Sequence, residues 1–377
     1  MGNAGDVKIA VIGMGFIGRY MRICYEKMAG GRLRGNVLLC KATGVGLEGL
    51  RNEFDCDIAV GGALDALRRL KPDIILLCPP PSQIPLVVKD EIAPYCAEQR
   101  QSGGVLPDIY TFGPRPKVDF YYEALGGDVN TVKILPNLYY TLGGLPSVYL
   151  DDSYITFSGT RAWPSTNRQR LISFLAPLGD AHEVSEEDSI PFLAMRTTTH
   201  CLNEMCFVIA DTLAERGLPG DHRNAASVMR AALREEWADV AEALVPCDMA
   251  DLEPPAAAFA AKSAVGFVYG LLDFSRNFRL PELTRSVIRT KRAEVQLVSV
   301  CMFSREEVNA ITRAHATKGG VCEKACRFFE DNCKDEMKAA FERHLGGGLE
   351  DAWWAAWRAK ACEAAETVAR HGLTLDL

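Results

Sequence analysis

Six residues near the start of the chain have the types and spacing of a phosphate-binding turn. They follow an apolar run at residues 8–12 and open an amphipathic stretch at residues 17–28. In this spacing, the first glycine permits a tight turn, the second lets the backbone approach a pyrophosphate, and the third lets helix and strand pack closely. The start of the helix adds free amide groups and a positive dipole end. The motif predicts dinucleotide binding through Gly13, Met14, Gly15, Phe16, Ile17 and Gly18. The alternative is a glycine-rich turn that holds no ligand.

The residues after the second apolar run bear on the choice of cofactor. An Asp or Glu at this place would accept hydrogen bonds from an adenosine ribose hydroxyl. The chain instead has Cys40-Lys41-Ala42-Thr43, which offers a cation and a hydroxyl. Lys41 and Thr43 therefore favour a 2′-phosphate, and we expect NADPH as the cofactor, with NADH still possible. The other interpretation is that Lys41 is an ordinary solvated loop cation.

The elements that would position these residues divide the chain into two unlike halves. Short apolar runs at residues 8–12, 37–40, 73–78, 131–135 and 148–150 alternate with helical patterns in the first half, as in a parallel sheet with crossover helices. From about residue 163 the periodicity is helical. We therefore predict an α/β fold, with a Rossmann-type parallel-sheet domain over residues 1–162 and an all-α domain over residues 163–377. In the last helical stretch, Trp353, Trp354 and Trp357 have a spacing more typical of core or subunit contact than of a ligand site.

Composition narrows the class of partner. The chain has 377 residues, of which 48% are hydrophobic, and a formal net charge of -7. The charges are interspersed, so no basic face predicts nucleic-acid or membrane-surface binding. We expect a small-molecule substrate, no membrane association, and a cytoplasmic location, because the first residues lack the pattern of a signal peptide.

The 13 cysteines are scattered through apolar segments, which is typical of reduced, buried thiols in a chain of this length. The spacing of Cys322, Cys326 and Cys333 lacks a Cys-x-x-Cys pair or a histidine cluster to complete four ligands. We expect no metal.

The order of short motifs resembles the pyrroline-5-carboxylate reductase family over residues 7–345. Leu77-Cys78-Pro79-Pro80 stands where that family has a Val-Lys-Pro turn, and residues 133–138 resemble its Arg-Val-Met-Pro-Asn-Thr strand and turn. Residues 174–179, followed by Glu186, resemble the entry to its helical dimerisation domain. Residues 317–322 resemble its Ser-Pro-Gly-Gly-Thr-Thr segment. The resemblance implies a homodimer or higher homo-oligomer and cofactor contacts from Cys78, Pro79, Pro80, Pro136 and Asn137. It implies substrate contacts from Thr317, Lys318, Gly319, Gly320, Val321 and Cys322.

The departures from that family concern the substrate. The lysine of its Val-Lys-Pro turn is Pro79 here. The proline of its Ser-Pro-Gly-Gly-Thr-Thr segment is Lys318, and the two hydroxyl residues of that segment are Val321 and Cys322. The resemblance implies that those hydroxyls help to hold a substrate carboxylate. Without them the carboxylate would lose up to two hydrogen bonds, so we expect pyrroline-5-carboxylate to be a poor substrate. A bulkier or less acidic imine is expected instead.

Mechanism follows from the kind of bond that is reduced. An alcohol dehydrogenase moves a proton on and off oxygen, whereas a cyclic imine can enter already protonated. The family's small turn inside its long helix is replaced here by a Thr run, which makes Thr198, Thr199 and His200 candidate catalytic or substrate-contacting residues. We predict a reductase that transfers hydride to a cyclic C=N bond. A different Rossmann dehydrogenase, acting on a hydroxy or prephenate-like acid, and a non-catalytic dinucleotide-binding protein remain the alternatives.

Overall fold

The computed structural model describes residues 7–113, 115–136, 154–158, 164–236, 252–277, 293–316, 320–347 and 351–373. The chain forms two compact units whose boundary falls between Ser189 and Ile190. We call them the sheet unit and the helical unit. The strand predicted at residues 148–150 lies outside the described residues, as do the predicted site residues Asn137, Thr317, Lys318 and Gly319.

The sheet unit is built on eight strands in the order β3-β2-β1-β4-β5-β6-β7-β8. The first six of these are mutually parallel, and β7 runs antiparallel to β6. The order 3-2-1-4-5-6 is that of the Rossmann fold, so the predicted α/β class is confirmed. The strands are β1 (Ile9–Ile12), β2 (Val37–Lys41), β3 (Asp57–Val60), β4 (Ile74–Leu77), β5 (Asp108–Thr111), β6 (Thr131–Pro136), β7 (Tyr154–Ser158) and β8 (Asp180–Glu183).

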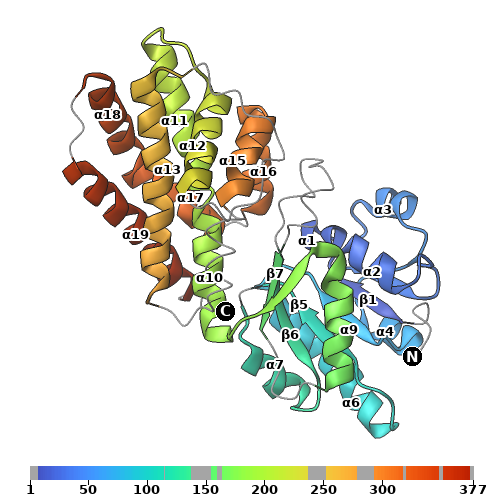
Figure 1. Ribbon diagram of the computed structural model, residues 1–377. Coiled ribbons are helices and arrows are strands. Elements are labelled where there is room, and N and C mark those ends of the chain that lie inside the picture. The colour runs from blue at the N-terminus through green and yellow to red at the C-terminus, as the bar shows by residue number, and fades with distance from the viewer. Residues whose placement is uncertain are drawn as a thin grey trace. The chain divides into compact units, whose positions relative to one another are not determined.

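Both faces of the central strands are covered, which explains why these strands read as continuous apolar runs. Alternate residues such as Ile9 and Val11 join a core with α2 (Arg22–Met28), α3 (Leu47–Glu53) and α9 (Ser165–Leu175). Their neighbours Ala10 and Ile12 join a second core on the opposite face. That core includes side chains from α4 (Leu64–Leu70), η1 (Val88–Ile92), α6 (Ala93–Gln101) and α7 (Val118–Leu125). Figure 1 shows this α/β/α layering in the sheet unit.

The strands predicted from apolar runs are β1, β2, β4 and β6, and all four are confirmed. Two parallel strands gave no such signal. β3 has no fully buried residue, and its first and last residues, Asp57 and Val60, are exposed. β5 begins with the charged Asp108, which is nevertheless fully buried.

The sheet unit extends further along the chain than the predicted boundary at residue 162. β7 and β8 continue the sheet beyond β6, and α9 between them packs on α2. Asp108 also holds α9, because its carboxylate accepts hydrogen bonds from Asn167 Nδ2 at 2.6 Å and Arg170 Nε at 3.1 Å. Residues 164–189 therefore belong with the sheet, and the all-helical part begins at Ile190.

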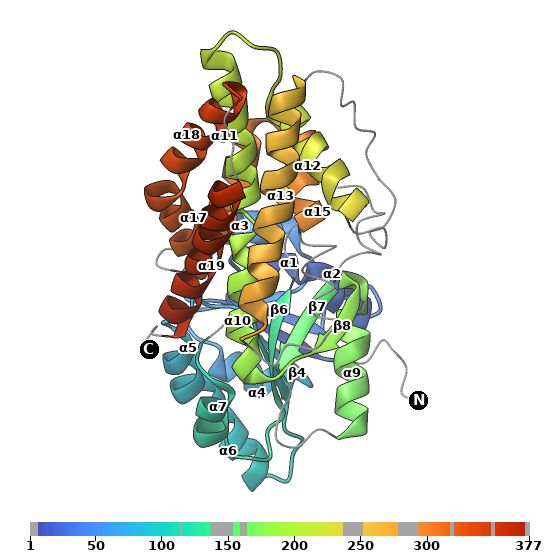
Figure 2. The same ribbon diagram turned by 60° about the vertical axis from the view of Figure 1, so that its left-hand side comes forward.

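The helical unit is a bundle of long helices (Figure 2). Its central α13 packs on α12 and α19, and α11 packs on α12 and α18. Phe259 of α13 stacks near Phe341 and Trp353, at centroid distances of 4.8 and 5.5 Å. The helices are α10 (Glu186–Thr198, which crosses the unit boundary), α11 (Cys201–Glu215), α12 (His222–Glu236), α13 (Pro254–Ser275), α15 (Ala293–Met302), α16 (Arg305–His315), α17 (Val321–Asn332), α18 (Lys334–Leu345) and α19 (Asp351–Leu373).

Among the described residues, α13 is long and apolar enough to cross a membrane by length and composition. Core helices of soluble proteins pass the same test. Phe259, Phe267 and Leu271 of α13 are each at most 1% exposed within the bundle, so packing against its neighbours accounts for its apolar character.

Candidate functional site

The loops that follow β1, β3 and β4 leave the sheet at one level. The Gly13 amide donates to the Cys40 carbonyl at 2.9 Å, and the Cys78 amide donates to the Ile12 carbonyl at 2.8 Å. The Gly61 amide donates to the Lys41 carbonyl at 3.0 Å. β1 pairs with β2 on one side and β4 on the other, so its carboxyl end lies where the strand order reverses. Open α/β sheets bind ligands at this switch point.

The protein's own backbone requires glycine at two of the three glycine positions in the first loop. Gly13 has a φ of +93°, and a Cβ there would lie 2.7 Å from the Pro79 nitrogen. A Cβ on Gly18 would lie 2.3 Å from the Gly13 carbonyl oxygen. Both glycines are therefore required by the protein's own backbone.

Gly15 is not required in this way. Its φ of -81° and ψ of -154° are extended, and a Cβ there would meet no protein atom within 4 Å. Gly15 is also exposed, whereas Gly18 is buried. The space in front of Gly15 thus faces outward from the loop, where a ligand can approach the backbone closely.

The helix after this loop is interrupted at Met21. α1 (Phe16–Tyr20) covers five residues, and α2 follows from Arg22. Met14 is buried, and Phe16 and Ile17 are partly exposed. The predicted amphipathic stretch is therefore helical but in two segments.

A cavity of about 220 Å³ opens at this level of the sheet unit. It brings together Gly13 and Gly15, Lys41, and the predicted Cys78, Pro79 and Pro80. The remaining predicted cofactor residues, Met14, Phe16, Ile17, Gly18, Thr43 and Pro136, are not among its lining residues; Thr43 is exposed, and Pro136 is buried at the end of β6. The full lining is Ile12, Gly13, Gly15, Cys40, Lys41, Ala42, Gly61, Gly62, Ala63, Cys78, Pro79, Pro80, Gln83, Val87 and Glu91.

Two charged side chains lie at the cavity, and both have backbone partners. Lys41 Nζ donates to the Val45 carbonyl at 2.5 Å. The Glu91 carboxylate accepts from the Ala63 amide and so fixes the loop after β3. Burial raises the pKa of the Cys40 thiol to about 12, with the nearby Glu91 carboxylate adding to the shift. Burial also raises the pKa of Cys78, so both thiols are protonated at neutral pH.

The prediction from sequence missed one wall of this cavity. Gly61 and Gly62 follow β3 with positive φ values of +88° and +149°, and Ala63 and Glu91 complete that side. The Gly-Gly pair was the available signal. The sequence analysis did not use this pair because β3, the strand before it, has no continuous apolar run and was not predicted.

The predicted residues of the helical unit lie in its interior. Thr198 and Thr199 are 0% exposed, and His200 is 3% exposed. Thr198 Oγ1 donates to the Ala194 carbonyl at 2.7 Å, and Thr199 Oγ1 donates to the Arg196 carbonyl at 2.6 Å. Both hydroxyls are thus engaged by carbonyl groups of α10. Their assignment to substrate stays a prediction.

Gly320, Val321 and Cys322 form the start of α17. Gly320 is its N-cap, with a φ of -80° and no side-chain cap, and Val321 and Cys322 are each 6% exposed. A hydrogen bond with Cys322, together with burial, raises the pKa of Cys326, and burial raises that of Cys333 to about 11. In the part of the chain that the structure describes, no three His, Cys, Asp or Glu residues form a metal-binding group, and every described cysteine is a free thiol.

No protein-family model matches the chain, and no curated protein matches its sequence. Among solved structures, the chain is similar to a pyrroline carboxylate reductase of Plasmodium falciparum with NADP bound, at 11% identity and a TM-score of 0.40, over 98% of this chain and 99% of that one. It is similar to a pyrroline-5-carboxylate reductase from Coxiella burnetii, at 14% identity and a TM-score of 0.40, over 95% and 98% of the two chains. It is also similar to a D-mandelate dehydrogenase with NADH and anilino(oxo)acetate, at 12% identity and a TM-score of 0.43, over 96% and 99%. These values describe a distant likeness and assign no activity.

Proposed function

We propose that the protein is an NADPH-dependent reductase of cyclic imines. The observation that carries the cofactor part of the proposal is Gly15, where a side chain would meet no protein atom and would face open space at the switch point of a Rossmann sheet. Glycine at this place has a physical reason if a pyrophosphate lies against the backbone. The cavity beside it joins the loops after β1, β2, β3 and β4.

The residues present fit a dinucleotide. The loop at residues 13–15 would hold the pyrophosphate, and Lys41 would lie toward the adenosine ribose at the end of β2. Pro79 and Pro80 would form an apolar wall beside the nicotinamide. When bound, a reduced nicotinamide supplies a hydride to an electrophilic carbon.

The titratable groups at the cavity favour an imine over a carbonyl substrate. Among the described lining residues, Cys40 and Cys78 are protonated thiols with raised pKa values, and Glu91 is engaged by the Ala63 amide. Lys41, the remaining titratable group of the lining, donates to the Val45 carbonyl. We infer that none of these groups cycles a proton on a substrate oxygen. A protonated cyclic imine needs position and a dry surface more than a proton donor. The motif resemblance to pyrroline-5-carboxylate reductases supports the same substrate class.

The test is NADPH oxidation against five- and six-membered cyclic imines, each with and without a carboxylate. We expect turnover of an imine without the carboxylate and weak turnover of pyrroline-5-carboxylate, because Val321 and Cys322 replace hydroxyl residues. The double variant Val321→Thr and Cys322→Thr should improve turnover of pyrroline-5-carboxylate. Rapid proline formation by the unaltered protein would contradict the substrate assignment.

Two other outcomes would replace the proposal. Oxidation of a hydroxy acid with NADP⁺ would identify a different dehydrogenase. Tight NADPH binding with no turnover of imines or hydroxy acids would identify a binding protein.

We further propose a cytoplasmic homodimer formed through the helical unit, since its Ala-rich helices offer faces for association. Light scattering that gives a monomer at micromolar concentration would contradict the dimer.

A further inference from the structure

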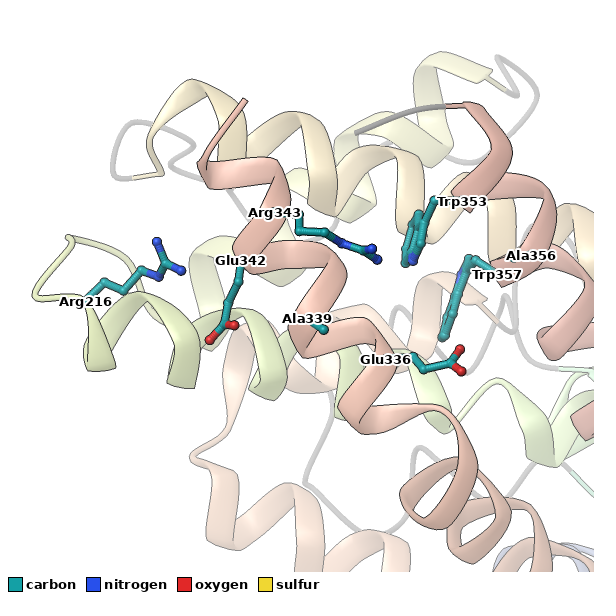
Figure 3. A pocket seen from close by; sticks show the side chains of 8 residues that line it. All are labelled: Arg216, Glu336, Ala339, Glu342, Arg343, Trp353, Ala356 and Trp357. Carbon is teal, nitrogen blue, oxygen red and sulfur yellow. The ribbon is translucent and has the colours of Figure 1, made fainter. Parts of the chain in front are cut away.

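The helical unit has a hollow of about 660 Å³ between the end of α11 and the facing sides of α18 and α19. Ala339 and Ala356 leave room for it, and the larger side chains around them are aromatic or charged. Its lining is Arg216, Glu336, Ala339, Glu342, Arg343, Trp353, Ala356 and Trp357 (Figure 3). This volume is within the range of small-molecule sites.

One wall of the hollow is made of two stacked indoles. The rings of Trp353 and Trp357 are 5.9 Å apart between centroids and 5° from parallel. Trp357 is 2% exposed and lies edge-on to Phe329, at 6.1 Å. Trp353 is half-buried. Trp357 fulfils the expectation that this stripe packs in the core, whereas Trp353 leaves aromatic surface open to the hollow.

The indole N–H of Trp357 is a buried donor without an acceptor among the described residues. A buried indole N–H ordinarily finds a partner, and leaving it unpaired costs about 1–3 kcal/mol. Because Trp357 lines the hollow, a ligand with an acceptor oxygen can supply that partner.

The charged groups around the hollow favour an anion. Glu336 is neutralised by Lys360, at 2.9 Å. Arg216 and Arg343 have no ion pair with any residue that the structure describes. Both guanidinium groups line the hollow, and Figure 3 shows that of Arg343 extending toward Trp353. With Glu336 paired, the charged groups that line the hollow are two arginines and one carboxylate, Glu342. The lining therefore has a net charge of +1.

We propose that this hollow binds a planar aromatic monocarboxylate. The flat ring would lie against Trp353, and the carboxylate would accept from the Arg343 guanidinium and from the Trp357 indole. Arg216 would add positive charge at the other end of the hollow (Figure 3). Guanidinium and carboxylate form strong, oriented hydrogen bonds, and aromatic rings pack favourably against indole. The hollow belongs entirely to the helical unit, so the proposal does not depend on dinucleotide binding or on imine reduction.

The test uses three ligands of nearly equal shape on the full-length protein. Benzoate, benzamide and benzamidine carry charges of -1, 0 and +1 on one ring. Binding is measured by calorimetry and by quenching of tryptophan fluorescence. We expect benzoate to bind at least tenfold more tightly than benzamide, and benzamidine to bind most weakly. Equal affinities, tighter benzamidine, or no benzoate binding up to its solubility limit would overturn the proposal.

Variants locate the binding. Arg343→Ala should weaken benzoate binding at least tenfold, and Arg216→Ala should weaken it as well. Both residues are exposed, so both variants should fold, which circular dichroism checks.

The matched control is Arg327→Ala on α17. The Arg327 side chain is 68% exposed and pairs with Glu323, so this variant should leave the affinity for benzoate unchanged. Unchanged affinity in Arg343→Ala would overturn the proposal. So would dissociation of an oligomer by Arg343→Ala without benzoate binding, because the hollow would then be a subunit contact.

Discussion

Lys41 is the cavity residue whose charge bears on cofactor choice. Its ammonium group is held by the Val45 carbonyl at the carboxyl end of β2, and the residue lines the cavity. We predict that NADPH binds more tightly than NADH because a lysine can donate charge-assisted hydrogen bonds to the 2′-phosphate.

Lys41→Asp should reduce the NADPH-to-NADH affinity ratio by about tenfold or more. The two cofactors are compared by titration. The control is Lys89→Asp, the same charge change at an exposed position on η1 that is not among the cavity residues. Equal affinities in the unaltered protein would show that Lys41 is an ordinary loop cation.

Residues close in sequence were predictable at this site, and residues brought together by tertiary contacts were not. The glycines at 13, 15 and 18 come shortly after β1, and Lys41 is the last residue of β2. Glu91 lies 28 residues after Ala63, and its role arises because η1 carries its carboxylate to the Ala63 amide. No local pattern encodes that contact.

Helix α9 shows how a buried charge connects elements. Asp108 is 0% exposed at the start of β5, and it accepts from Asn130 Nδ2 at 3.1 Å as well as from Asn167 and Arg170 of α9. Asp108→Ala would leave those donors without their acceptor. We predict a loss of about 1–3 kcal/mol in the free energy of unfolding, measured by urea denaturation.

The control for this element is Asp128→Ala. Asp128 pairs with Arg100 on the surface, with its side chain 55% exposed, and its removal should cost less than about 1 kcal/mol. Equal losses in the two variants would show that Asp108 does not secure α9 to the sheet.

The same element explains the misplaced domain boundary. The helical periodicity of α9 is correct as a local pattern, but its membership in the sheet unit depends on Asp108, 57 residues before its first residue. β7 and β8 are likewise defined by pairing with each other and with β6. The periodicity of apolar residues within a segment predicts whether it is a helix or a strand. Which elements it packs against depends on residues distant in sequence.

At the scale of the whole molecule, the chain combines a Rossmann-type sheet unit with a helical bundle, and both units contain cavities. The fold class was predictable because the parallel strands are short apolar runs separated by helices. The proposed activity depends first on dinucleotide binding in the sheet unit. Substrate identity and oligomerisation are secondary to that claim.

The most direct test is a titration of NADPH into the unaltered protein, Gly15→Val and Gly18→Ala. The unaltered protein should bind saturably. Gly15→Val should lose binding while the protein stays folded, because its Cβ meets no protein atom within 4 Å but occupies the approach to the backbone. Gly18→Ala should instead lose about 1–3 kcal/mol of stability, since its Cβ would lie 2.3 Å from the Gly13 oxygen. Undiminished NADPH affinity in a folded Gly15→Val protein would contradict the account.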